Sequence, residues 1–202
     1  MRVIAGTLGG RMFDSPGTSR THPMSDKARG ALFNMLGDIQ GLHVLDAFAG
    51  TGAMSFEAAS RGAASSLAIE SDRAAQEVIA KNIETLGLGK TVRLVKSAAG
   101  AWLNTAPPEH YGIVLCDPPY DDLQFNIVER LAERVAPGGL LVLSWPGSAH
   151  VPALQGFEQV LGRSYGDMQL IFYRKTENLL APDELVLYSG HEPRKVDHYR
   201  QY

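Results

Sequence analysis

The feature that most constrains the fold is a regular alternation of short apolar segments and helical segments between residues 42 and 144. The apolar segments are continuous runs, which is typical of parallel strands buried on both faces. Strands are expected over 42–48, 66–69, 92–95, 111–116 and 140–144, and helices over 53–61, 72–86, 98–103 and 123–135. The pattern predicts an α/β fold with a mostly parallel sheet.

The two ends of the chain depart from this alternation. Two β-rich segments between 161 and 175 flank Gly166-Asp167, which predicts an antiparallel hairpin at the sheet edge. Glycines between 2–5 and 11–13 predict a small hairpin, and Ser25 is expected to cap a helix over 26–36. We therefore divide the chain into an N-terminal segment (1–24), a main domain (25–175) and a polar tail (176–202), in which 185–188 is a candidate strand.

Composition excludes several classes of protein. A chain of 202 residues that is 45% hydrophobic can bury a full core. The single cysteine, Cys116, excludes a disulfide framework, and the histidines lack the spacing of metal ligands, so we predict no metal. No apolar run approaches the roughly 20 residues of a membrane span, and the N-terminus does not resemble a signal peptide. We expect a cytoplasmic protein without a membrane partner.

A glycine turn follows the first predicted strand, in the sequence Asp46-Ala47-Phe48-Ala49-Gly50-Thr51-Gly52. Gly50 and Gly52 allow a tight turn and close approach of a ligand to the backbone. Glu70 ends the second predicted strand, where a carboxylate can accept hydrogen bonds from both hydroxyls of a ribose. The pattern predicts a nucleoside-containing cofactor.

The glycine spacing separates two such cofactors. Dinucleotide sites use Gly-x-Gly-x-x-Gly, but Ser55 occupies the position of the third glycine. Asp46 would also lie near a pyrophosphate, where a further negative charge is unfavourable. A sulfonium ligand with a free amino group would instead be stabilised there, so the pattern favours S-adenosylmethionine over a nicotinamide dinucleotide. A purely structural glycine turn is the third alternative.

A second motif, Asp117-Pro118-Pro119-Tyr120, ends the fourth predicted strand. Two prolines stiffen the turn and remove two backbone donors, which leaves the Pro118 carbonyl as a free acceptor. Asp117 adds a carboxylate acceptor and Tyr120 a ring for stacking. These groups suit the exocyclic amine of a nucleobase, whose two protons they would hold while its nitrogen attacks a methyl carbon. The alternative is a rigid surface turn without catalytic function.

Together the motifs resemble the RsmD family of bacterial 16S rRNA (guanine-N2)-methyltransferases over about residues 1–175. The resemblance rests on 2–6, Gly10-Arg11, 22–29, Leu32-Phe33-Asn34, the glycine turn, the Asp-Pro-Pro-Tyr turn and Tyr165-Gly166-Asp167. It implies a class I, Rossmann-like methyltransferase with a mostly parallel seven-stranded sheet. It also implies methyl transfer from S-adenosylmethionine to the N2 amine of a guanine in the small ribosomal subunit.

The resemblance also implies roles for individual residues. The cofactor would be held by Asp46, Phe48, Gly50, Gly52 and Glu70, and the guanine would be oriented by Asp117, Pro118 and Tyr120. Arg2, Arg11 and Arg29 are candidates for contact with RNA. Two positions depart from the family pattern: His22 replaces an arginine, and Ser97-Ala98 replaces an acidic or amide residue, so we expect Ser97 to substitute in the adenine contact.

The charge distribution bears on the partner. The net charge is −3, but residues 1–30 carry +3 and the remainder −6. A basic head can bind phosphates locally, whereas the acidic body disfavours tight binding to naked RNA. We therefore expect a monomer that acts on 16S rRNA within an assembled or partly assembled small subunit. The alternatives are another nucleic-acid amino methyltransferase, such as an adenine-N6 enzyme, and a non-catalytic RNA-binding assembly factor.

Overall fold

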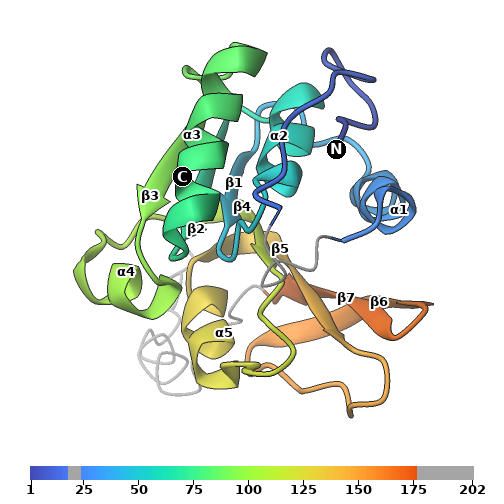
Figure 1. The fold of residues 1–202 in the computed structure, drawn as a ribbon. Coiled ribbons are helices and arrows are strands. Elements are labelled where there is room, and N and C mark those ends of the chain that lie inside the picture. The colour runs from blue at the N-terminus through green and yellow to red at the C-terminus, as the bar shows by residue number, and fades with distance from the viewer. Residues whose placement is uncertain (18–23, 177–202) are drawn as a thin grey trace, which may run out of the picture.

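In the computed structural model, which describes residues 1–17 and 24–176, a seven-stranded sheet lies between two layers of helices (Figure 1). The helices are α1 (Asp26–Leu36), α2 (Ala53–Ser60), α3 (Arg73–Leu86), α4 (Ala99–Thr105) and α5 (Phe125–Ala132). The strands are β1 (His43–Asp46), β2 (Ser65–Glu70), β3 (Val92–Lys96), β4 (Tyr111–Cys116), β5 (Val135–Pro146), β6 (Phe157–Tyr165) and β7 (Met168–Lys175).

The strand order is β3-β2-β1-β4-β5-β7-β6. The first five strands in sequence pair in parallel, and β7 pairs antiparallel with both β5 and β6. The predicted parallel sheet and its antiparallel edge hairpin are therefore confirmed. The order reverses between β1 and β4, and in open α/β sheets this reversal is where ligands bind.

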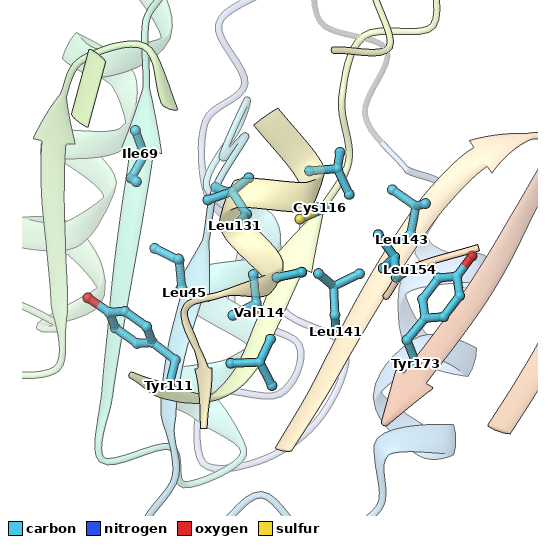
Figure 2. Close-up of a cluster of buried hydrophobic side chains, with 14 of the residues drawn as sticks. Leu45, Ile69, Tyr111, Val114, Cys116, Leu131, Leu141, Leu143, Leu154 and Tyr173 are labelled. Atoms are coloured by element: carbon cyan, nitrogen blue, oxygen red, sulfur yellow. The ribbon is translucent and has the colours of Figure 1, made fainter. Parts of the chain in front are cut away.

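Each face of the sheet is covered by its own helices. Leu131 of α5 packs on one face, in a cluster that includes Leu45, Val114 and Cys116 (Figure 2). Leu103 of α4 belongs to the same cluster. Leu32 of α1, Met54 of α2 and Ile79 of α3 belong to clusters that cover the other face. This two-sided burial explains why the central strands read as continuous apolar runs.

The boundaries near β5 differ from the prediction. Residues 137–139, between the predicted helix 123–135 and the predicted strand 140–144, lie inside β5. Val135 already pairs with Tyr111, and a register shift separates that pair from Ile113↔Leu140. A Cβ on Gly139 would lie 2.8 Å from the carbonyl oxygen of Gly112, so this irregular stretch requires a glycine. Helix α5 is correspondingly shorter than the predicted 123–135.

The N-terminal head, residues 1–17, is a hairpin that packs on α2 and α3 (Figure 1). Its antiparallel bridge joins Arg2 to Met12. Gly6 has a φ of +81°, and a Cβ there would lie 1.9 Å from the backbone oxygen of Ser60. The head is thus in direct backbone contact with the end of α2. His22 and the candidate strand 185–188 lie outside the described residues.

Candidate functional site

The glycine turn and the Asp-Pro-Pro-Tyr turn leave the carboxyl ends of adjacent strands. Asp46, the last residue of β1, is in register with Leu115 of β4, and Cys116 ends β4 immediately before Asp117. Because β1 and β4 flank the reversal in strand order, both turns open at the position expected for a ligand. The structure therefore brings together the two motifs that the sequence singled out.

The glycine turn is shaped by two different requirements. Gly52 has a φ of +77°, and a Cβ there would lie 2.7 Å from the Phe56 ring, so the packing of α2 excludes a side chain. Gly50 has a φ of +55°, but a Cβ there would have only the Phe48 oxygen, 4.0 Å away, nearby. The space above Gly50 is thus open and allows a ligand to approach the backbone.

Glu70 joins this turn to the start of α3. Its Oε2 accepts a hydrogen bond from the Gly50 amide at 2.6 Å, and its Oε1 accepts one from the Asp72 amide at 2.7 Å. Each carboxylate oxygen keeps a further lone pair. Glu70 can therefore hold the turn in place and still accept hydrogen bonds from the hydroxyls of a ribose.

Asp46 is fully buried and only half satisfied. Its Oδ2 accepts hydrogen bonds from the amide and hydroxyl of Ser55, at 3.1 and 2.7 Å, while Oδ1 has no partner among the described residues. Burial, with smaller contributions from the charges of Asp117 and Glu70, raises the pKa of Asp46 to about 7. A positively charged ligand nearby would stabilise the ionised form of Asp46, which fits the sulfonium and amino groups of S-adenosylmethionine.

Asp117 and Tyr120 share a hydrogen-bonding partner on β5. Burial raises the pKa of Asp117 to about 6, and a side-chain hydrogen bond from Ser144 opposes the rise. The Tyr120 hydroxyl lies 2.8 Å from Ser144 Oγ, and burial raises the pKa of Tyr120 to about 12. At neutral pH the site therefore presents a mostly ionised carboxylate beside a neutral phenol. Pro118 between them is buried.

A small pocket lies next to these groups. Asp117 and Ser144 line it together with apolar side chains from α1, α2, β4, β5 and β7, among them Leu32, Met54 and Leu170. The polar groups of the site thus border the apolar core, and the pocket itself has no room for a base.

The other two predicted cofactor residues lie beside the turn. Phe48 is half-buried against the core cluster on the α4 and α5 face. The Ser97 amide donates to the Glu70 carbonyl oxygen at 3.0 Å, and its hydroxyl donates to the Ala98 carbonyl at 3.1 Å. Ser97 is therefore next to the residue predicted to bind the ribose.

The predicted RNA contacts fall into two groups. Arg2 and Arg11 are exposed on the head. Arg29, in contrast, is 0% exposed, and its Nη2 donates to the Arg2 carbonyl at 2.6 Å and to Asp26 Oδ1 at 2.9 Å. The expectation that Arg29 contacts RNA is therefore wrong for this conformation, because its guanidinium is used internally to join α1 to the head.

Sequence reasoning missed three residues that shape the site and the head. Ser55 holds Asp46, Ser144 contacts the Asp-Pro-Pro-Tyr turn, and the buried Glu57 accepts hydrogen bonds from the amides of Ile4 and Ala5. Ser144 had a usable signal, because it is a polar residue near the end of an otherwise apolar strand. Ser55 and Glu57 resembled ordinary helix residues.

Within residues 1–17 and 24–176, no group of three or more histidine, cysteine or acidic side chains could hold a metal ion. None of the helices in that part of the chain is long and apolar enough to cross a membrane.

The strand order and the two turns at the strand ends are those of the class I S-adenosylmethionine-dependent methyltransferase fold. The family model described as "Conserved hypothetical protein 95" matches residues 1–174, and the chain belongs to this family, the RsmD family.

Similar proteins carry methyltransferase names. The chain is 29% identical over 183 residues to YlbH of Bacillus subtilis, named as an rRNA methyltransferase, covering 87% of this chain and 99% of that one. It is 40% identical over 121 residues to ribosomal RNA small subunit methyltransferase D of Escherichia coli, covering 59% and 60%. A solved structure described as methyltransferase YhhF of Escherichia coli superposes with a TM-score of 0.78 at 30% identity, covering 87% and 98%.

Proposed function

We propose that this protein transfers the methyl group of S-adenosylmethionine to the exocyclic N2 amine of a guanine in 16S rRNA. The observation that carries the proposal is the position of the glycine turn and the Asp-Pro-Pro-Tyr turn at the ends of the adjacent strands β1 and β4. Membership of the RsmD family and the small-subunit rRNA substrate named for its Escherichia coli relative support it.

The residues around the glycine turn fit S-adenosylmethionine, which supplies a methyl group on a positively charged sulfur. Asp46, whose buried Oδ1 has no partner within residues 1–17 and 24–176, favours positive charge nearby. Glu70 would accept hydrogen bonds from the ribose hydroxyls, and Phe48 and Ser97 would line the same site. The backbone at Gly50 and Gly52 would form the floor beneath the ligand.

The Asp-Pro-Pro-Tyr turn would hold the target base. Asp117 and the Pro118 carbonyl would accept the two protons of the guanine amine, and the Tyr120 ring would stack on the base. These hydrogen bonds favour a nitrogen whose lone pair points at the methyl carbon. The base must leave its stack to reach this position. Asp117 is the group placed to take the proton that the amine releases.

The substrate we propose is 16S rRNA in an assembled or partly assembled small subunit, and the enzyme would act as a cytoplasmic monomer. Arg2 and Arg11 would contact RNA phosphates. The head alone is small, so the subunit would supply the remaining contacts. Specificity would come from RNA shape more than from base sequence.

The proposal is tested by transfer of labelled methyl groups to small subunits from cells that lack this enzyme, with naked 16S rRNA and DNA in parallel. Asp117→Asn should lower the rate by about 100-fold or more, because it removes the carboxylate at the amine. Asp121→Asn, in the same exposed loop, is the matched control and should retain the rate.

Nucleoside analysis of the product identifies the acceptor. Label in N2-methylguanosine, strongest on subunits, is the expected result. Label in N6-methyladenosine would replace the proposed acceptor with adenine. Cofactor and subunit binding without any transfer would indicate an assembly factor instead of an enzyme.

A further inference from the structure

Ser144 lies where β5 passes the start of the Asp-Pro-Pro-Tyr turn. Cys116 of β4 is in register with Leu143 of β5, so the next residues along each strand, Asp117 and Ser144, are neighbours. Ser144 is 2% exposed and lines the same small pocket as Asp117. Its place is thus set by the sheet and does not depend on a loop.

The Ser144 hydroxyl has two neighbours in the site. Its oxygen lies 2.8 Å from the Tyr120 hydroxyl. The adjacent Asp117 side chain has its pKa lowered by Ser144, as by a hydrogen-bond donor. A serine hydroxyl has one proton to donate and can accept another. Asp117 as a carboxylate can only accept, so the arrangement that satisfies all three groups has Tyr120 donating to Ser144 and Ser144 donating to Asp117.

We propose that Ser144 is a positioning residue that fixes Tyr120 and Asp117 relative to one another at the target base. The proposal rests on the proposed function, because it assigns Asp117 and Tyr120 to that base. Tyr120 is 39% exposed and follows a proline pair, so Ser144 supplies a fixed point for a ring that is open to solvent on one side.

The same hydrogen bond affects the charge of Asp117. Burial favours the protonated form, and the bond from Ser144 opposes this and keeps the pKa of Asp117 at about 6. Removing the hydroxyl should raise that pKa, so less of the carboxylate that accepts the amine protons would be present near neutral pH.

Two measurements on the full-length protein test the proposal. In Ser144→Ala, carboxyl 13C NMR titration should show the pKa of Asp117 raised by about half to one pH unit, the equivalent of one hydrogen bond. The acidic limb of the kcat–pH profile should move in the same direction by a similar amount. Ser144→Thr keeps the hydroxyl and should restore both values. The Asp117 resonance is assigned by its loss in Asp117→Asn.

Tyr173→Phe is the matched control for loss of a buried hydroxyl. Tyr173 is 2% exposed, and its hydroxyl donates to the Pro152 carbonyl at 2.6 Å, outside the site. This variant should leave the pKa of Asp117 and the pH profile unchanged.

The two proposals fail in different ways. An unshifted pKa of Asp117 in Ser144→Ala would overturn the role of Ser144, whether or not the enzyme is active. Wild-type protein that transfers no methyl group would overturn the proposed function, even where the Asp117 pKa responds to Ser144 as expected.

Discussion

At the level of single residues, the site is defined by three carboxylates with different environments. Glu70 receives two backbone hydrogen bonds, Asp117 lies beside the Ser144 hydroxyl, which lowers its pKa, and Asp46 has one oxygen without a partner among the described residues. Grouping negative charge in a partly dry site is unfavourable for the ligand-free fold and favourable for a cation. The site is therefore arranged for a positively charged ligand at some expense in stability.

Asp46→Asn should change how the free energy of unfolding depends on pH. The pKa of Asp46 is raised from 3.8 to about 7, so between these values the folded protein binds a proton that the unfolded chain has lost. Stability from this group is greatest in acid and falls as the pH rises toward 7. Asparagine does not titrate, so the variant does not lose this stability as the pH rises. Its stability relative to wild type should rise by about 2 kcal/mol between pH 5 and pH 8 in urea unfolding.

The same variant should bind S-adenosylmethionine at least about ten-fold more weakly, since it lacks the charge that favours a cation. Asp121→Asn, exposed beyond β4, is the control and should change neither the pH dependence nor the affinity. Parallel stability curves for wild type and Asp46→Asn would contradict the interpretation.

At the level of elements, a glutamate–arginine pair one turn apart lies at the end of α2, where Arg61 caps the helix, and another lies within α3. The pair at α2 also attaches another segment of the chain. Glu57 is 0% exposed, accepts from Arg61 at 2.7 Å and also accepts from the head amides of Ile4 and Ala5. Arg61 in turn donates to Asn34 of α1, and its guanidinium lies over the Phe33 ring. The Leu32-Phe33-Asn34 motif thus helps to attach α1, next to the head.

Glu57→Gln should destabilise the protein by about 2–4 kcal/mol. The glutamine NH2 group would face an N–H donor where the carboxylate oxygen had accepted a hydrogen bond, and the negative charge beside Arg61 would be lost. The matched control is Glu77→Gln on α3. Glu77 pairs with Arg73 at 3.4 Å, but these side chains are 66% and 91% exposed, so the change should be within about 0.5 kcal/mol. Equal effects in chemical denaturation would show that Glu57 does not hold the head.

At the level of the whole molecule, charge is divided between a basic N-terminal stretch, residues 1–30 at +3, and an acidic remainder at −6. The head packs on α2 and α3, and its hydrophobic residues Val3 and Phe13 belong to the same cluster as Phe56 and Ile79. It is therefore built into the domain core, and it presents Arg2 and Arg11 at the surface. This arrangement gives the proposed RNA contacts a rigid support.

Replacing both Arg2 and Arg11 by glutamine should weaken binding to small subunits and make its salt dependence shallower by about one to two units in the slope of log K against log salt. Lys90→Gln with Arg93→Gln removes the same charge from exposed positions in the body and should have a smaller effect. Equal losses in a binding titration would indicate that net charge, and not the head, governs association.

The alternating α/β fold and the two turns that carry the site could be predicted from the amino-acid sequence alone. These features follow from local causes: continuous apolar runs predict buried parallel strands, and glycine and proline mark the turns that follow them. The family motifs pointed to Asp46, Glu70 and Asp117 at the strand ends. The boundaries around β5, where a glycine-containing irregularity interrupts the pairing, were misread, and β6 begins at Phe157, earlier than the predicted 161.

Which side chains contact one another became clear only from the folded molecule. Three features join segments that are distant in sequence. They are the buried position of Arg29, the contact of Ser144 with Tyr120, and the attachment of the head to Glu57. Such contacts depend on which strands become neighbours and which helix faces are covered, and no local pattern encodes either. The physical reason is that burial and hydrogen-bond partners belong to the packed molecule, whereas propensity and turn chemistry belong to the chain.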